Sequence, residues 1–360
     1  MRLGTCIALE LCVAAGAIAG VWVGVGKTIE LAGNYTSEAE AATASVPRAA
    51  SLPRVASLPR AELHVAVPAQ TTVFGEPDDV LLAPIGGEVT RVKLNHGGTS
   101  LSLRIDFADG AQAAFKPQQT HPQSDPRKEI AAYRIDRLLG IGHVPPAKPG
   151  AFKVDDLIAA TEPDWRTYTA GRIEDEGIAH DGVIRGELSW WIPEIRDQKI
   201  GEWRVDEDAG MALWTGYLHP KETIPDEHRA LVEQLVACVV FDVLIDNADR
   251  WTGYNTKGSM DRRTLYFMDN TLSFSLFTFG HKTNLDPLFK IEVFPRRLVE
   301  RLRALTPEAI AAAIDIGDDP LGPLLTTEEI TAMLARRDHL IAYIDGLIAQ
   351  YGEANVLALP

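Results

Sequence analysis

The sequence Asp246-Asn247-Ala248-Asp249-Arg250 is followed by Asn255 and, beyond a short strand-like segment, by Asp269-Asn270. This arrangement places an Asp and an Asn on one loop and a second Asp after the next strand. Phosphoryl-transfer enzymes use it to orient a hydroxyl nucleophile and to hold magnesium on ATP. The stretch therefore makes phosphoryl transfer the first hypothesis, and with it a fold that brings two such loops together.

The region upstream of this motif has the pattern of an antiparallel sheet. Residues 88–94 and 101–107 alternate apolar and polar side chains, and a third strand is expected over 112–116. The first two strands are joined by a segment that contains Gly97 and Gly98. The pair is either an ordinary hairpin turn or a loop that covers nucleotide phosphates, where missing side chains permit close backbone approach.

Lys116 ends the third expected strand, and Glu129 lies in the helix that follows it. Asp125 as N-cap, Pro126 at the first helical position and the break at Gly140 define that helix. A strand Lys paired with a Glu on the next helix is how kinases hold ATP phosphates. An unpaired surface Lys and a solvated helix Glu are also common, so the pair gains its functional meaning from the downstream motif.

The rest of the chain is mainly helical in pattern. Residues 231–245, 295–305, 307–314 and 326–351 have helical apolar spacing. The segment 161–225 is harder to interpret, apart from Trp190-Trp191-Ile192-Pro193, which we expect to cross between lobes. There Trp191 either lines an adenine pocket or belongs to the core. The prediction is an α+β, two-lobed, protein-kinase-like fold. Its small antiparallel sheet lobe with one helix spans residues 73–188, its helical lobe spans 189–360, and a nucleotide cleft separates them.

These motifs resemble a known group of enzymes, the secretory-pathway kinases related to four-jointed and the Golgi casein kinase, together with their bacterial relatives. The resemblance covers about residues 80–358. Phosphoinositide 3/4-kinases use similar Asp-Arg and Asp-Asn motifs and are a more distant resemblance. The stretches that carry the resemblance are 116–117, 129–140 leading into Val144-Pro145, 247–250, 269–270, 334–340 and 351–353.

The resemblance implies a role for each matching residue. Lys116 would contact the phosphates of ATP and Glu129 would orient that lysine. Asp249 would be the catalytic carboxylate, and Asn255 and Asp269 would bind Mg²⁺ or Mn²⁺. Elementary chemistry agrees, since a well-placed carboxylate accepts the proton of the nucleophile and these metal ions prefer hard oxygen donors.

The chain departs from this family pattern at two positions. Trp251 stands where many relatives have His after Asp-Arg, and Thr271 follows Asp269-Asn270 where Gly is frequent. The first change alters how the loop is braced, and the second stiffens the metal loop. Neither removes a metal ligand or the base, so an active enzyme is expected, with a degenerate pseudokinase as the alternative.

The charge of the chain excludes one class of partner. The chain has 360 residues and a formal net charge of −15, and residues 1–60 are slightly basic, so the acidity lies in the remainder. Nucleic-acid binding needs a basic face that contacts phosphates, and no Lys/Arg cluster supplies one. We therefore expect no nucleic-acid partner.

The N-terminus differs from the rest of the chain. Residues 3–26 are almost wholly apolar, which is near the length of about 20 residues that spans a bilayer. We predict a signal anchor over 1–27, with a cleaved signal peptide as the alternative because Ala17-Ile18-Ala19 has the small-x-small form. Residues 28–72, rich in Ala, Pro, Ser and Arg, form a disordered linker. The domain is then membrane-anchored and extracytoplasmic, on the periplasmic or secretory side.

The functional prediction is an ATP-dependent, divalent-metal-dependent kinase. Its acceptor is a hydroxyl of an exported protein (Ser/Thr) or of a glycan, and the motifs do not decide between them. One alternative is a catalytically silent kinase-like scaffold at the cell envelope, where ATP is scarce. The other is a phosphoinositide-type lipid kinase, which the acidic domain makes unattractive because lipid headgroups are anionic.

Overall fold

The computed structural model describes residues 72–95, 98–252 and 254–360, and Ala66–Pro360 form one compact unit. The predicted signal anchor over 1–27 and nearly all of the linker over 28–72 lie outside the described residues, as does Gly97. Within the described part of the chain, no helix is both long enough and apolar enough to cross a membrane.

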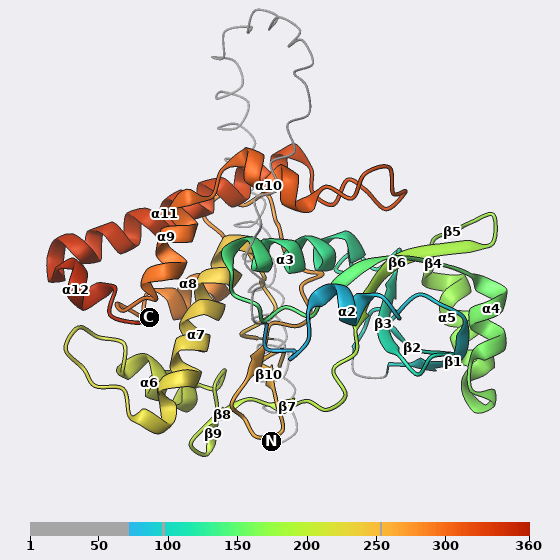
Figure 1. The fold of residues 1–360 in the computed structure, drawn as a ribbon, viewed down its shortest axis with the longest axis horizontal. Coiled ribbons are helices and arrows are strands. Elements are labelled where there is room, and N and C mark those ends of the chain that lie inside the picture. Colours follow the sequence, from blue (N-terminus) through green and yellow to red (C-terminus); the bar gives the residue numbers. More distant parts are fainter. Residues whose placement is uncertain (1–71, 96–97, 253) are drawn as a thin grey trace, which may run out of the picture. The chain divides into compact units, whose positions relative to one another are not determined.

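The N-terminal half is built on a six-stranded antiparallel sheet with the order β1-β2-β3-β6-β4 and β5 paired to β6 (Figure 1). Along β3, buried and partly exposed residues alternate, so Phe115 enters a core under the sheet while Lys116 points to the opposite face. The sheet was expected, but with fewer strands. Its strands are β1 (Val89–Leu94), β2 (Leu103–Phe107), β3 (Gln112–Pro117), β4 (Ala147–Lys153), β5 (Ala179–His180) and β6 (Val183–Trp190).

Helix α3 (Pro126–Leu139) follows β3 and begins and ends as the sequence predicted. Asp125 caps it by accepting a hydrogen bond from the Arg127 amide at 3.1 Å, and Gly140 ends it in the left-handed region at φ 66°. The buried residues of α3, among them Ile135, pack into the helical core and not into the core under the sheet. The helix therefore fixes Glu129 relative to the helical half of the domain.

The expectation of a single helix in the sheet lobe was wrong. Besides α3, a short α2 (Asp78–Leu82) precedes the sheet, and α4 (Val154–Ala160), a 3₁₀ turn η1 (Pro163–Trp165) and α5 (Arg166–Glu176) lie between β4 and β6. Only Leu157 is buried on α4, and only Thr169 and Ile173 are buried on α5. With so few buried positions, these helices have almost no apolar period to detect in the sequence.

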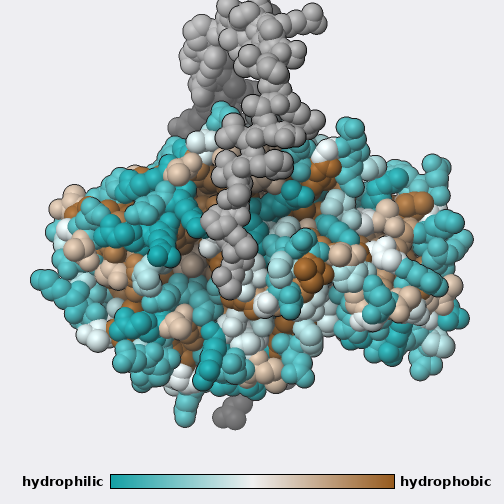
Figure 2. Space-filling view, in the orientation of Figure 1, coloured by the Kyte–Doolittle hydropathy of each residue, from teal (hydrophilic) through white to brown (hydrophobic). Residues whose placement is uncertain are grey.

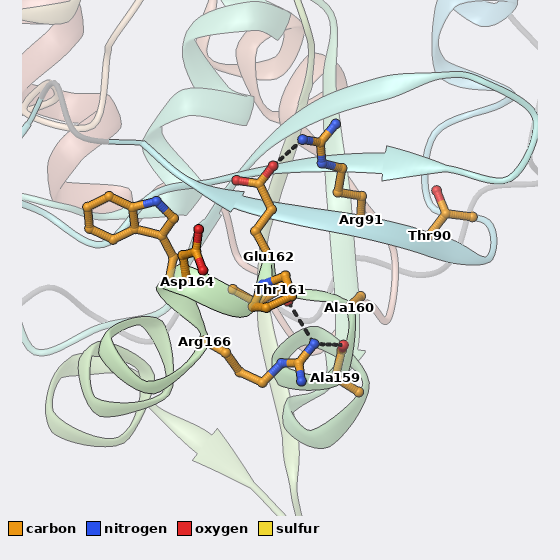
Figure 3. Close-up of a pocket in the computed structure, with 10 residues that line it drawn as sticks. Thr90, Arg91, Ala159, Ala160, Thr161, Glu162, Asp164 and Arg166 are labelled. Carbon is orange, nitrogen blue, oxygen red and sulfur yellow. Dashed lines mark hydrogen bonds and ion pairs between the residues drawn. The ribbon is translucent and has the colours of Figure 1, made fainter.

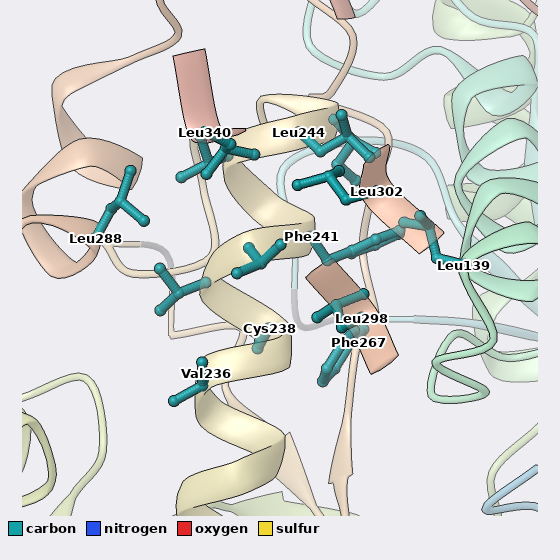
Figure 4. Packing of buried hydrophobic residues seen from close by; sticks show 14 of the residues in the cluster. Leu139, Val236, Cys238, Phe241, Leu244, Phe267, Leu288, Leu298, Leu302 and Leu340 are labelled. Carbon is teal, nitrogen blue, oxygen red and sulfur yellow. The ribbon is translucent and has the colours of Figure 1, made fainter. Parts of the chain in front are cut away.

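The C-terminal half is helical, as expected, and centres on α7 (Asp226–Ile245). This helix is buried on nearly all sides, and Cys238 and Phe241 are fully buried among its neighbours (Figure 4). The other helices are α6 (Asp208–Gly216), α8 (Lys282–Leu288), α9 (Arg296–Ala304), α10 (Pro307–Ile314), α11 (Thr327–Tyr351) and α12 (Glu353–Val356). The short strands are β7 (Arg196–Asp197), β8 (Lys199–Ile200), β9 (Trp203–Arg204), β10 (Lys257–Gly258) and β11 (Leu265–Tyr266).

The last strand of the large sheet, β6, ends at Trp190, slightly beyond the boundary predicted after Leu188. Past it, the short strands β7, β10 and β11 form a second small sheet. The predicted motif at residues 246–250 lies between α7 and β10, and the predicted motif at Asp269 follows β11. Hydrophilic side chains cover most of the face seen in Figure 2, with small apolar patches between them.

Candidate active site

Lys116 and Asp269, far apart in the sequence, meet in space. Lys116 Nζ lies 2.6 Å from Asp269 Oδ1 and 3.5 Å from Glu129 Oε2. Burial lowers the pKa of Lys116, but Asp269, Glu129 and Glu187 together outweigh it and raise the pKa above its ordinary value. The ammonium therefore stays charged and links β3, α3 and the segment after β11.

Glu129 contacts Asn270 more closely than it contacts Lys116. Its Oε2 accepts a hydrogen bond from the Asn270 backbone amide at 2.7 Å, and its Oε1 accepts one from Asn270 Nδ2 at 2.9 Å. The sequence suggested that Glu129 orients the lysine. The structure adds that Glu129 holds the backbone of the loop on which Asp269 stands.

Asp269 lies where a cation can reach it. Its side chain is 46% exposed, its backbone is left-handed at φ 59°, and Thr271 Oγ1 donates to its Oδ1 at 3.3 Å. Lys116 lowers the pKa of Asp269 below its ordinary value. Thr271, in the position where relatives often have Gly, thus contacts the candidate metal ligand directly.

Asp249 is held by two asparagines. Its backbone amide donates to Asn247 Oδ1 at 3.2 Å, and its Oδ2 accepts a hydrogen bond from Asn255 Nδ2 at 2.8 Å. Burial and, after it, the charge of Asp269 raise the pKa of Asp249, while the Asn255 hydrogen bond opposes that rise. Because Asn255 donates through its nitrogen, its Oδ1 is directed away from this bond and can serve a metal ion.

Arg250 contacts both the loop of Asp249 and the segment around Asp269, and it forms an ion pair with Asp242. The role of Asp242 was not identified from the sequence. Both side chains are fully buried, and the Arg250 Nε to Asp242 Oδ2 distance is 3.2 Å. Arg250 Nη2 also donates to Asn270 Oδ1 at 2.7 Å, and Nη1 donates to the Met268 carbonyl. Burial raises the pKa of Asp242, while Arg250 opposes that rise. The sequence carries one signal of this contact, because Asp242 is an acidic residue within a mostly apolar helical run.

Asp246 ties the catalytic loop to the segment beyond the metal loop. It ends α7 in the left-handed region at φ 57° and is fully buried. Its Oδ1 accepts hydrogen bonds from the His281 amide at 2.7 Å and from Asn284 Nδ2 at 3.1 Å. Thr283 Oγ1 donates to the Ala248 carbonyl at 3.2 Å. These contacts fix the loop that carries Asp249.

Two further predicted site residues, Gly98 and Trp191, lie outside the contacts described above. Gly98 is exposed, and a side chain there would meet no described atom within 4 Å. Trp191 is partly buried, and the guanidinium of Arg104 on β2 lies 5.4 Å from the centre of its ring. That contact places Trp191 beside the sheet. An adenine-lining role for Trp191 and a phosphate-covering role for Gly98 stay predictions.

Glu187 was missed by the sequence analysis. It lies opposite Lys116 in the β3–β6 register, so the two side chains share one face of the sheet. Glu187 is only 1% exposed, and its Oε2 accepts a hydrogen bond from Ser189 Oγ at 2.6 Å. Its Oε1 has no hydrogen-bond partner among the described residues. Burial, and then Glu129, raise its pKa to about 8.

The residues present fit a divalent cation that is shared with a nucleotide. Among the described residues, no three His, Cys, Asp or Glu side chains converge into a complete metal site. Magnesium commonly uses one or two protein carboxylates together with phosphate oxygens and water. The half-exposed Asp269 and the free Oδ1 of Asn255 are such donors.

A separate pocket is lined by Thr90 and Arg91 of β1 and by residues 159–166, which include η1 (Figure 3). In it Arg91 pairs with Glu162, and Arg166 donates to the carbonyls of Ala159 and Thr161 at 3.2 and 3.1 Å. Its lining includes none of the predicted site residues. Glu162 is therefore a reference position away from the predicted site residues.

The sequence of this chain is similar to those of known kinases. The family described as "Golgi casein kinase, C-terminal, Fam20" matches residues 183–356. Over that part, this chain is similar to the Golgi casein kinase family. A Homo sapiens glycosaminoglycan xylosylkinase is 23% identical over 313 residues, which cover 75% of each protein. The Homo sapiens extracellular serine/threonine protein kinase FAM20C is 24% identical over 321 residues, covering 75% of this chain and 54% of that protein.

The fold of the Golgi casein kinase relatives extends over most of this chain. The solved structure of the Golgi casein kinase with Mn/ADP bound has a TM-score of 0.61 at 17% identity and covers 78% of each chain. The resemblance expected from the sequence is therefore confirmed, and so is the mixed helix-and-sheet, kinase-like fold.

Proposed function

We propose that this protein is an ATP-dependent, divalent-metal-dependent kinase that transfers the γ-phosphate to a hydroxyl group. The observation that carries the proposal is the contact of Lys116 with Asp269 at 2.6 Å, beside an Asp249 held by Asn255. A lysine, a metal-binding carboxylate and a base carboxylate are the parts that phosphoryl transfer requires. The relation to named kinases supports the same conclusion.

In this proposal Asp249 takes the proton of the acceptor hydroxyl. Its raised pKa suits a base that must bind a proton during the reaction, because a carboxylate with a very low pKa is a poor acceptor. Asn255 keeps the carboxylate in one orientation through Asp249 Oδ2. The other oxygen of Asp249 then faces the acceptor.

Lys116, Asn255 and Asp269 serve the nucleotide. Lys116 binds the phosphates, and Asp269 and the Oδ1 of Asn255 hold the divalent cation, which neutralises charge on the transferring phosphate when bound. Glu129 holds the Asn270 backbone, so the position of Asp269 is set before the nucleotide arrives. We assign ATP as donor, and Mg²⁺ or Mn²⁺ as the metal.

The acceptor is a hydroxyl of an exported protein or of a glycan. The xylosylkinase relative is named for a glycan substrate and the FAM20C relative for Ser/Thr of proteins, so each acceptor has one precedent. We further propose that residues 1–27 anchor the protein in a membrane and that the kinase lies on the extracytoplasmic side. The division into lobes at 188/189, and the linker over 28–72, belong to the same proposal.

The test is metal-dependent turnover of ATP by the protein, compared with Asp269→Ala. We expect ADP formation that requires Mg²⁺ or Mn²⁺ and is lost in the variant, with Glu162→Gln as a control that keeps wild-type turnover. Nucleotide binding without turnover in the wild-type protein would instead identify the catalytically silent scaffold. Absence of nucleotide binding contradicts the kinase proposal altogether.

A further inference from the structure

Lys116 has three carboxylates around it, whereas the kinase scheme accounts for only two. Asp269 is within 2.6 Å and Glu129 within 3.5 Å of its Nζ. Glu187, opposite it on β6, is the third, and its electrostatic effect also raises the pKa of Lys116. A buried carboxyl oxygen without a partner costs free energy, about 1–3 kcal/mol for a typical buried polar group. The Oε1 of Glu187 beside Lys116, unpartnered among the described residues, therefore needs a functional explanation.

The partners of Lys116 change when the site is loaded. In the free protein its shortest contact is with Asp269 Oδ1. A divalent cation bound to Asp269 repels the ammonium, because two positive charges at close range repel each other. Lys116 must then leave Asp269 and find other acceptors for its three N–H groups.

Glu129 is poorly suited to take over that role alone. Both of its oxygens already accept hydrogen bonds from Asn270, at 2.7 and 2.9 Å, and those bonds position the metal loop. Glu187 is different, because its Oε2 is engaged by Ser189 and its Oε1 is without a described partner. Of the two buried carboxyls beside Lys116, Glu187 is the one with an oxygen, Oε1, that accepts no hydrogen bond from the described residues.

We propose that Glu187 is a positioning residue whose Oε1 receives the Lys116 ammonium when a metal-bound nucleotide occupies the cleft. The inference rests on the proposed kinase function. Glu187 would hold Lys116 from the β6 side, while one remaining N–H points to the phosphates. The acceptor chemistry needs an oxygen lone pair at this position and not a full negative charge.

The protonation of Glu187 fits such a neutral acceptor. Burial and Glu129 raise its pKa to about 8, so at neutral pH the free protein carries it mainly as a carboxylic acid. When Oε2 is protonated it donates to Ser189 Oγ instead of accepting from it, and Oε1 keeps a lone pair that accepts from an ammonium. Lys116 on β3, Glu129 on α3 and Asp269 after β11 are the charged groups that act on Glu187. A neutral Glu187 does not compete with the phosphates for the charge of Lys116.

The test compares Glu187→Leu with Glu187→Gln. Leu fills a similar volume without an acceptor, whereas Gln keeps an oxygen acceptor and a donor for Ser189. Calorimetry measures the Kd of Mn·ADP for each full-length variant, with Glu162→Gln as a matched Glu→Gln control in the same sheet lobe. We expect Leu to weaken binding about tenfold, as expected for losing a hydrogen bond to a charged group, and Gln to restore it to within about threefold of wild type.

A second readout separates positioning from a merely structural role. If Glu187 acts through Lys116, adding Glu187→Leu to a Lys116→Met protein changes the Kd no further. The melting temperature without ligand should be unchanged or higher in Glu187→Leu, because a buried unpaired carboxyl has been removed. Only the increase in melting temperature on adding Mn·ADP should shrink.

Each other result overturns the proposal. Wild-type affinity in Glu187→Leu removes any role for the acceptor, and equal losses in Leu and Gln show that charge, not an acceptor oxygen, is needed. A further loss in the Lys116→Met background shows that Glu187 does not act through Lys116. If Glu187→Leu does not fold, Glu187→Ala replaces it. Failure of the wild-type protein to bind Mn·ADP contradicts the kinase function itself.

Discussion

Two ion pairs in this molecule contrast in what surrounds them. Asp242 and Arg250 are both fully buried, and Arg250 also donates to Asn270 and to a backbone carbonyl. Lys116 and Asp269 are closer together, yet the side chain of Asp269 is 46% exposed. The first pair has its hydrogen-bonding groups used within the protein, and the second leaves some for a ligand.

The difference separates framework from site. The buried Asp242–Arg250 pair holds the loops that carry Asp249 and Asp269 in fixed relation, and neither side chain of the pair is exposed to a substrate. Near Lys116, by contrast, Asp269 is half exposed, Asn255 uses only its Nδ2 in its bond to Asp249, and Glu187 Oε1 has no hydrogen-bond partner among the described residues. We infer that ligand binding uses the cleft pair and that folding depends on the buried pair.

Breaking the buried pair should have the largest effect. Arg250→Met leaves Asp242 buried without a counter-charge, and loss of one partner of a buried pair costs about 3–5 kcal/mol. The free energy of unfolding from chemical denaturation measures this loss. Lys116→Met is the matched comparison and should cost clearly less. Equal losses in the two variants would contradict the distinction between framework and site.

Removing the base should abolish activity without affecting the fold. Asp249→Asn keeps a side chain that can contact Asn255, but it can no longer accept a proton, so turnover should fall by about a hundredfold or more. The measurement is the initial rate of metal-dependent ADP formation, with the melting temperature as the control for folding. Retained turnover in this variant would exclude Asp249 as the base.

Glu187 allows a test by pH. Its folded-state pKa, about 8, is above the ordinary value of 4.5, so the folded protein binds a proton more tightly and loses stability as pH rises between these values. Glu187→Gln cannot ionise, so its advantage over wild type should grow from pH 5 to pH 8, by on the order of 1–3 kcal/mol. Denaturation curves at several pH values measure it. A constant difference would show that Glu187 is not buried as a neutral acid.

Substitution of the half-exposed Asp269 should give the smallest effect on stability. Lys116 lowers the pKa of Asp269, so the stabilisation is present above the ordinary Asp pKa of 3.8 and is lost as pH falls through the lower folded-state pKa. Since Asp269 is half exposed, Asp269→Asn should cost no more than about 1 kcal/mol at pH 7. In acid titrations of stability, the difference from wild type should begin to shrink near pH 3.8 and vanish only below the lower folded-state pKa of Asp269. A difference that persists in acid would mean that another contact of Asp269 stabilises the fold.

Much of this site could be predicted because its residues carry chemistry in a local pattern. Asp125, Pro126 and Gly140 determine the ends of α3, and the alternation along β3 places Lys116 opposite the core. The loops at Asp249 and Asp269 were visible as motifs. The two-lobed interpretation followed from sheet patterns before residue 117 and helical patterns after residue 225.

The remainder could not be predicted because it depends on contacts between distant segments. Glu187 is one acid in a strand, and its meaning comes only from the register that sets it opposite Lys116. Asp242 is an acidic residue in a mostly apolar helix, and only its ion pair with Arg250 explains why it is buried there. Helices α4 and α5 bury too few residues to produce a clear apolar period.

The most direct test of the central claim is a crystal structure with Mn²⁺ and ADP bound, examined by anomalous scattering from manganese. We expect a manganese peak within coordination distance of Asp269 and Asn255, with Lys116 moved from Asp269 to a phosphate oxygen. A nucleotide bound without manganese at these residues, or manganese bound elsewhere in the chain, would contradict it.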